Sequence, residues 1–183
     1  MSSAPPGANP RRAAFTLLEM LVVIGIITVL AGLVIGGGSR AVEAGRIARA
    51  RTELAVLSSA LEEYRRACGD YPQTDDAARL LQSLIGKRGP TNSLITGRCL
   101  LEISRFTIGQ SRDPFSDSTA IFIDPWDEPY RYAYKSELPW SNPSYVLYSS
   151  GADRSVSPAL LTGGFADVSS PLNADNLHAD RPW

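Results

Sequence analysis

One acidic residue, Glu19, lies at the start of a long apolar run, and its carboxylate needs a chemical explanation. A charged side chain inside a bilayer costs about 2.5–3.5 kcal/mol on insertion scales, so such an acid usually has a function and a partner. A simpler explanation is also available. Thr16 and Glu19 have the spacing of a capping box, which satisfies free amides at a helix start. An acid at that place also suits the helix dipole.

The sequence lacks the residue patterns of the common enzyme classes. It contains no Gly-x-Ser-x-Gly elbow, no phosphate-binding loop and one histidine, His178, which we expect at the surface near the C-terminus. The formal net charge is -1, from 18 basic and 19 acidic residues, and this gives no basic field for binding nucleic acid. A membrane-anchored enzyme is therefore the weakest functional alternative.

The apolar run from Met20 to Gly38 contains no charged residue. About 20 helical residues cross a bilayer core of ~30 Å, so the run predicts a membrane anchor. The alternatives are a buried core helix and a cleaved secretory signal, whose apolar part is normally about 7–15 residues. Arg11 and Arg12 precede the run, and the positive-inside rule keeps the N-terminus in the cytoplasm. The remainder of the chain would then lie outside the cytoplasmic membrane.

The pattern changes after the run, because residues 39–67 combine charged residues with one apolar stripe. Its members recur at alternating spacings of three and four: Ile47, Ala50, Leu54, Leu57, Leu61, Tyr64 and Cys68. This periodicity predicts a helix with one apolar face. The stripe either forms a short coiled coil or covers the chain's own globular part. A single helix from about Thr16 to Ala67 accounts for both halves.

The segment from Arg11 to Val23 reads RRAAFTLLEMLVV and resembles the class III signal of the type IV pilin-like family. The resemblance implies that a prepilin peptidase cuts between Ala14 and Phe15 and methylates the new amine of Phe15. Ala14 stands where the family usually has glycine. In an assembled filament, the amine of one subunit would meet Glu19 of a neighbour and set the axial register.

Three further segments resemble the major pseudopilins of type II secretion: Gly69–Pro72, Asp124–Tyr130 and Ser149–Asp153. The resemblance implies an α+β, pilin-like fold, with a long N-terminal helix packed on a small antiparallel sheet and extended C-terminal loops. The implied domains are a leader (1–14), a transmembrane half-helix (15–38), a periplasmic half-helix (39–67) and a globular domain (68–183).

Several elements of the globular part can be predicted from local patterns. Residues 75–85 are expected to form a short helix capped by Thr74 or Asp75. Strands are expected at 120–124, at 144–149 and at 130–134, where three tyrosines alternate onto one face. Two segments, 88–118 and 135–144, are longer loops than the family pattern has.

The resemblance also implies one bound Ca²⁺, because the relatives hold this ion between the turn and the tail after it. Asp153 matches the turn aspartate, and either Asp175 or Asp180 matches the second one. Hard oxygen ligands of this kind suit calcium. The alternative is that these aspartates make ordinary Asx turns in a loop rich in glycine, serine and proline.

Two cysteines, Cys68 and Cys99, would both face an oxidising compartment in this topology. A disulfide between them would stabilise the domain by about 3–4 kcal/mol in the chain-entropy model. Alternatively, Cys68 is a free thiol within the buried stripe.

Taken together, these expectations describe a filament subunit in the bacterial inner membrane, with its globular domain in the periplasm. Its partners would be copies of itself, minor pseudopilins, the prepilin peptidase, an inner-membrane assembly platform and membrane lipid. The function expected is that of a type II secretion pseudopilus, which drives protein export. The alternative within the family is a type IV pilus or DNA-uptake pilin.

Overall fold

The computed structural model describes residues 16–111, 113–136, 139–155, 157 and 160–179, without the side chains of residues 33–38. The chain forms two compact units. The first ends at Val42, and the second begins at Glu43.

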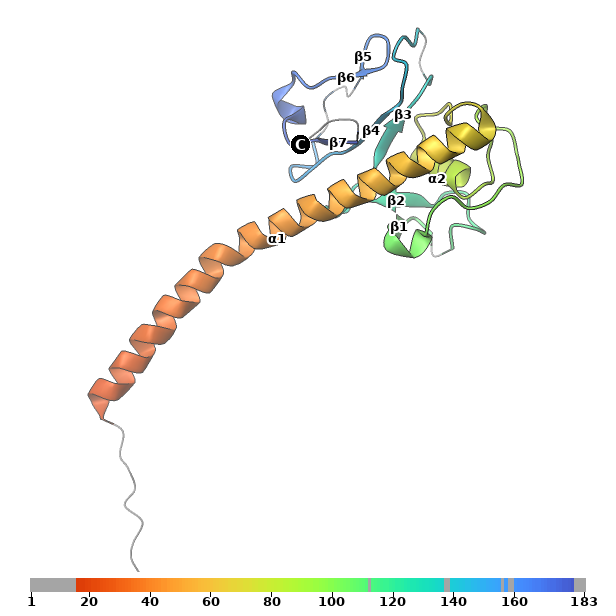
Figure 1. Ribbon diagram of the computed structural model, residues 1–183. Helices are drawn as coiled ribbons and strands as arrows, with labels where there is room; N and C mark the ends of the chain where they lie inside the picture. Colours follow the sequence, from red (N-terminus) through yellow and green to blue (C-terminus); the bar gives the residue numbers. More distant parts are fainter. Residues whose placement is uncertain (1–15, 112, 137–138, 156, 158–159, 180–183) are drawn as a thin grey trace, which may run out of the picture. The chain divides into compact units, whose positions relative to one another are not determined.

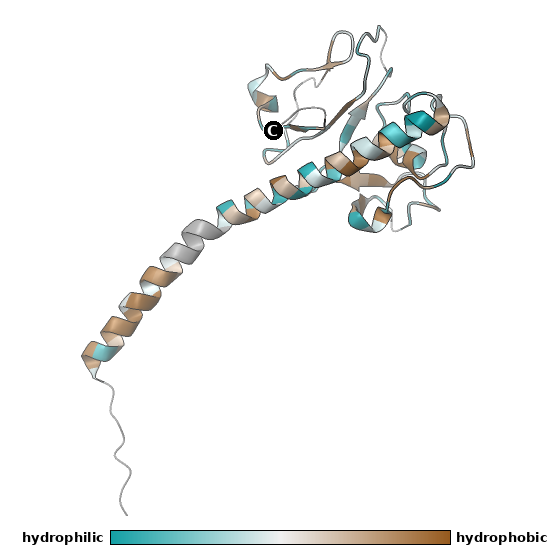
Figure 2. Ribbon diagram, viewed as in Figure 1, coloured by the Kyte–Doolittle hydropathy of each residue, from teal (hydrophilic) through white to brown (hydrophobic). Residues whose placement is uncertain are grey.

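One helix, α1 (Leu17–Cys68), spans 52 residues, as the sequence predicted (Figure 1). It contains no proline, and it ends where Gly69 adopts a φ of +88° and its N–H bonds to the Arg65 carbonyl at 2.8 Å. Glycine is suited to this left-handed position at a helix C-terminus. The described part of α1 in the first unit is mostly apolar (Figure 2). In the helical stretches whose side chains are described, none combines the length and hydropathy required to cross a membrane.

The apolar stripe of α1 covers the chain's own globular part, which was one of the two alternatives. Its fully buried members in the second unit are Ala50, Leu54, Leu57, Leu61 and Tyr64. Ile47 and Cys68, at the two ends of the stripe, are partly buried against the same core. Because each buried leucine stabilises the fold by about 1.5–3 kcal/mol, this face of α1 contributes a large share of the core.

The short helix α2 (Ala77–Leu84) follows, but the prediction that Thr74 or Asp75 caps it is wrong. The cap is Asp76, whose Oδ1 accepts hydrogen bonds from the backbone N–H groups of Ala78 at 2.8 Å and Arg79 at 3.3 Å. Thr74 instead accepts from the Asp76 N–H at 3.0 Å. Thr74, Asp75 and Asp76 are all good caps by residue type, so composition does not select among them.

In the described part of the chain, antiparallel strands form three small sheets, which confirms the predicted α+β architecture (Figure 1). One sheet pairs β1 (Thr107–Gly109) with β2 (Ile121–Ile123), after a 3₁₀ turn η1 (Ile103–Arg105). The central sheet has the order β3-β4-β7, formed by β3 (Arg131–Ala133), β4 (Val146–Ser149) and β7 (Leu177–His178). The third is a ribbon of β5 (Leu160–Leu161) and β6 (Phe165–Ala166), followed by a second 3₁₀ turn, η2 (Pro171–Asn173).

The tyrosines around β3 face the core, as their alternation predicted. Tyr130, Tyr132 and Tyr134 are all buried, and their hydroxyls bond to distant segments. The Tyr132 hydroxyl donates to the Pro72 carbonyl at 2.8 Å, and that of Tyr130 donates to the Glu53 carboxylate at 2.7 Å. Buried phenols generally need such partners. These bonds connect β3 to α1 and to the turn that follows it.

His178 is not the surface residue expected from its position near the C-terminus. It is 5% exposed and lies in β7, directly opposite Tyr148 of β4. The two rings stack with their centroids 5.1 Å apart. The short strand β7 brings this end of the chain into the central sheet. A strand of two residues is too short to produce a recognisable alternating pattern in the sequence.

Candidate functional site: the helix start and the C-terminal loop

The first turn of α1 is closed by Thr16. The Glu19 N–H bonds to the Thr16 carbonyl at 3.1 Å and to its hydroxyl at 3.2 Å, which is one half of the predicted capping box. The other half would need the Glu19 carboxylate as an acceptor. Among the described residues, that carboxylate has no hydrogen-bond or ion-pair partner, and the side chain is exposed. The cap therefore leaves the acid free to meet another group.

The residues that follow Glu19 are apolar on every side of the helix. All residues from 17 to 32 are exposed in the single chain, and Leu17 reaches 83% exposure. A helix that is apolar all round is normally buried, either in a large core or in a membrane. The chain itself covers none of these described side chains, so an external apolar environment has to do so. Ala14 and Phe15, the predicted processing residues, lie outside the described residues.

The turn after β4 and the segment before β7 meet at two of the predicted calcium ligands. The Asp153 N–H donates to Oδ2 of Asp175 at 3.0 Å, and the Asp153 carboxylate accepts from the Ser155 N–H at 2.7 Å. Gly151 has a φ of +73°, and a Cβ there would lie 2.5 Å from the Asp175 carbonyl oxygen. Glycine is therefore required at this close approach.

This loop brings carboxylate, amide and backbone oxygens close together. Within the described residues, no group of three or more histidine, cysteine, aspartate or glutamate side chains could hold a metal ion. The third predicted ligand, Asp180, lies outside those residues. The Oδ1 atom of Asn176, next to Asp175, is buried and has no hydrogen-bond partner in the described part of the chain. Carboxylate, amide and backbone oxygens are the donors that Ca²⁺ prefers, so the residue types fit the ion.

Two buried polar residues organise this region and were not identified as site residues from the sequence. Asp124 is 2% exposed, and its carboxylate accepts from the backbone of Trp126 and Glu128, both at 2.9 Å, and from the Ser149 hydroxyl at 2.5 Å. Asn173 is 4% exposed and bonds to the Asp167 carbonyl at 2.7 Å. An Asp-Pro pair signals a turn, but it does not reveal which distant hydroxyl the carboxylate will meet.

Asp70 connects the end of α1 to the end of β3. Burial raises the pKa of its carboxyl, but the hydrogen bonds from Lys135, Tyr134, Gln73 and the Tyr71 N–H outweigh that effect and lower the pKa to about 2. The contacts from Lys135 Nζ and the Tyr134 hydroxyl measure 2.7 and 2.8 Å. The carboxylate is thus ionised at any physiological pH, and it holds the helix end against the central sheet.

The two cysteines are separate in the structure. Cys68 is the last residue of α1 and is half-buried, whereas Cys99 is exposed and its thiol contacts the Leu101 carbonyl at 3.1 Å. Both thiols are free. The disulfide between them stays a prediction.

Comparisons with known proteins agree with the resemblance read from the N-terminal sequence. Residues 9–35 match the family model described as the prokaryotic N-terminal methylation motif. The chain is also similar to the type II secretion system core protein G of Pseudomonas aeruginosa. The two are 25% identical over 144 residues, which cover 78% of this chain and 85% of that protein. No solved structure matches the chain at a comparable level. The chain thus carries an N-terminal methylation motif and is similar, at a distance, to the core protein G of type II secretion.

Proposed function

We propose that this chain is a structural filament subunit of a type II secretion pseudopilus, whose growth drives protein export. The observation that carries the proposal is the start of α1. There a capped helix presents Glu19 without a partner among the described residues, followed by residues that are exposed and apolar on all sides. A subunit that buries this segment first in lipid and then among copies of itself satisfies both features.

Processing is the first step of the proposed sequence. A prepilin peptidase cuts between Ala14 and Phe15, on the cytoplasmic side of the inner membrane, and methylates the Phe15 amine. The match to the N-terminal methylation motif supports this step. Arg11 and Arg12 before the apolar run favour a cytoplasmic N-terminus, so the second unit would lie in the periplasm.

Assembly then pairs the Phe15 amine of one subunit with Glu19 of its neighbour. In the low dielectric of a helical filament core the two charges attract each other strongly, whereas either charge alone is penalised. The pair therefore stabilises one axial position of the incoming subunit relative to the others. Apolar helix contacts alone do not discriminate between such positions so sharply. Minor pseudopilins and an inner-membrane assembly platform would complete the system.

We also propose that the C-terminal loop binds one Ca²⁺, with Asp153 and Asp175 as ligands and Asp180 as a further candidate. The hydrogen bond between the Asp153 backbone and the Asp175 carboxylate supports this, because it already brings the two residues together. The ion would neutralise their charges and fasten the turn after β4 to the segment before β7.

The test of the proposed function begins with the N-terminus of the protein from native membranes. Mass spectrometry should find methylated Phe15 at the N-terminus, in place of Met1. Deleting the gene should abolish export of type II substrates, and the intact gene should restore it. If export stays normal and the protein appears in surface fibres, the chain belongs to a type IV pilus. A native protein that still begins with Met1 would contradict the processing step.

A further inference from the structure

One groove of the second unit has no part in the function described above. It has a volume of about 310 Å³ and lies between α1 and the loop that precedes β7. Its lining consists of Glu43, Ile47, Arg51, Trp126, Ala152 and residues 174–177. It is called the helix–loop groove here.

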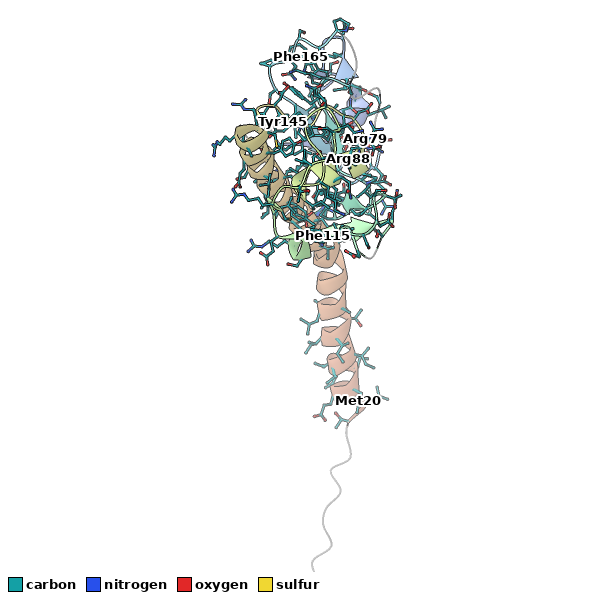
Figure 3. All side chains as sticks on the ribbon, turned by 90° about the vertical axis from the view of Figure 1, so that its right-hand side faces the viewer. Met20, Arg79, Arg88, Phe115, Tyr145 and Phe165 are labelled. Atoms are coloured by element: carbon teal, nitrogen blue, oxygen red, sulfur yellow. The ribbon has the colours of Figure 1, made fainter. Side chains whose placement is uncertain are left out.

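The other apolar surface of the second unit is scattered. Phe115 and Phe165 are each about half-exposed, but Figure 3 labels them at opposite ends of the unit. Leu94, the most exposed of the apolar residues in this unit, lies on a third segment, between α2 and β1. Single exposed apolar residues are normal in folded proteins. The groove differs from them because several apolar side chains converge on one hollow.

The helix–loop groove is mostly apolar, and the structure fixes both of its walls. Glu43, Ile47 and Arg51 are four residues apart, so they lie along one face of α1. The Trp126 indole N–H donates to the Glu43 carboxylate at 3.1 Å. In the opposite wall, the hydrogen bond to the Asp175 carboxylate holds the loop against the turn after β4. The hollow between these walls has the size of one large side chain rather than of a second helix.

One hydrogen-bond acceptor of the lining lacks a donor. The Oδ1 atom of Asn176 is buried and has no partner in the described part of the chain. The Nδ2 atom of the same amide donates to Asn173 at 3.2 Å, which fixes the orientation of the amide. A buried acceptor without a donor destabilises a fold. An occupant with an apolar body and one N–H group would fill the hollow and satisfy this atom.

The chain supplies such a group a few residues away. Leu177 lines the groove, and Ala179 is the last described residue before the segment 180–183, which reads Asp-Arg-Pro-Trp. The Ala179 N–H bonds to the Leu147 carbonyl at 2.9 Å, and Ala179 lies in a turn, so the chain leaves the sheet at a fixed point. Four extended residues span about 13–14 Å, whereas two span at most about 7 Å. Trp183 is therefore within reach of the groove.

From these observations we propose that the segment 180–183 folds back over the helix–loop groove and that the indole of Trp183 fills it. The ring packs against Ile47 and Leu177, and its N–H donates to Asn176 Oδ1. Tryptophan suits this place because it combines a large apolar surface with a single donor. The segment thus ties the loop before β7 to α1. This contact lies within one chain and depends neither on a filament nor on calcium.

A segment of the same chain is favoured over a separate ligand for an entropic reason. Because the segment starts at the fixed Ala179, its docking closes only a short loop, and the cost of loop closure grows with length. Pro182 fixes one backbone dihedral next to Trp183, which lowers the cost further. A second copy would in addition lose its translational and rotational freedom.

The first test is a photo-crosslink in the full chain, purified as a monomer in detergent with chelator present. A benzoyl-phenylalanine in place of Trp183 should form an adduct within the same chain, with Ile47 or with residues 174–177, mapped by mass spectrometry. The same photoreactive residue in place of Leu172 is the matched control. Leu172 is 51% exposed and is not part of the lining, so it should form no adduct with Ile47.

Hydrogen exchange in the same preparation gives the second readout. Trp183→Ala should raise the exchange rates of the amides of residues 174–177 about five- to tenfold, because the docked ring suppresses local opening of the loop. Trp183→Phe should have a smaller effect, since it retains an aromatic ring and loses only the donor. Leu172→Ala should leave these rates unchanged. Equal exchange of residues 54–61 in all variants shows that the core of α1 is intact.

The outcomes are separate from those for the proposed function. An adduct with detergent, with a second copy or with a distant part of the chain would overturn the inference. Identical exchange of residues 174–177 in Trp183→Ala and in the wild type would overturn it as well. Because neither assay requires filaments, export or calcium, these failures would leave the proposed function untouched.

Discussion

The hydroxyl of Tyr130 donates a 2.7 Å hydrogen bond to the carboxylate of Glu53, across 77 residues of sequence. Glu53 lies on α1 and is 6% exposed, and its second carboxylate oxygen accepts from Arg49 at 2.7 Å. Burial raises the pKa of the Tyr130 hydroxyl well above its usual range, so it stays a donor. This contact fixes the strand start after Pro129 against the long helix.

Replacing Tyr130 with phenylalanine should destabilise the second unit by about 1–2 kcal/mol, because a buried carboxylate oxygen loses its donor. For a chain of this size, that corresponds to a fall in Tm of about 2–8 °C. Tyr148→Phe is the control. Tyr148 is also buried, but its hydroxyl has no hydrogen-bond partner among the described residues, so its Tm should change by less than about 2 °C. Equal shifts in the two variants would contradict the assigned role.

Stability should fall in acid because of Asp70. Its folded pKa of about 2 lies below the usual value of 3.8 for an aspartate, so the folded state favours the ionised form. The contribution is complete above pH of about 4 and is lost as the pH falls from there towards 2. It amounts to about 1 kcal/mol after allowance for solvent screening of a partly exposed group. Denaturant melts between pH 5 and pH 2 measure it, and Asp70→Asn should make the slope in this interval smaller.

Two glycine-to-alanine substitutions should have opposite effects on stability. Gly164 has a φ of +80° and no room for a Cβ beside Trp140, so Gly164→Ala should destabilise by about 1–3 kcal/mol. Gly45 is helical and has open space around it, so Gly45→Ala should stabilise α1 by about 0.5–1 kcal/mol. Thermal melts of the full chain in detergent compare the two. A stabilising Gly164→Ala would show that the turn does not rest on the indole as described.

Glu19→Ala should insert into the membrane and be processed normally, yet assemble poorly. The apolar run is unchanged, but the Phe15 amine of a neighbour then has no counter-ion in low dielectric. The yield of sheared filaments, divided by the processed pool in membranes, reports this step. Thr28→Ala is a matched control in the same helix, because its hydroxyl bonds within the helix to the Ile24 carbonyl at 2.7 Å. Normal assembly of Glu19→Ala would remove the proposed register pair.

Calcium removal should lower the Tm of the full chain, since the ion would stabilise only the folded loop. The double variant Asp153→Asn/Asp175→Asn should melt at the same temperature with and without chelator. This variant preserves side-chain oxygens close to their present positions, so the loop can still form its turns. A wild-type melt that is identical in calcium and in chelator would contradict the metal site.

Long periodic patterns proved informative in this chain. The helix, its buried stripe and the three core-facing tyrosines follow from spacings repeated over many residues, and each was predicted from the sequence. A repeated pattern averages out local exceptions, because the same face must be buried at every turn.

Single positions whose partners are distant in sequence were harder to predict. His178 is buried because two residues complete a sheet with β4, and Asp124 is buried because the Ser149 hydroxyl meets it from another strand. Neither contact is reflected in a periodic pattern of the sequence around these residues. The choice of Asp76 as the α2 cap likewise depended on backbone geometry that adjacent, equally suitable residues do not reveal.

The buried stripe of α1 also determines where the chain can be shortened. Residues from Ala50 to Tyr64 form one wall of the core, so a truncation that begins after Cys68 would expose the tyrosines of β3 and leave a fragment prone to aggregation. A truncation that begins at Glu43 retains that wall and discards the exposed, apolar start of the helix. A water-soluble version suited to crystallisation should therefore start at Glu43, so that it keeps the amphipathic half of α1.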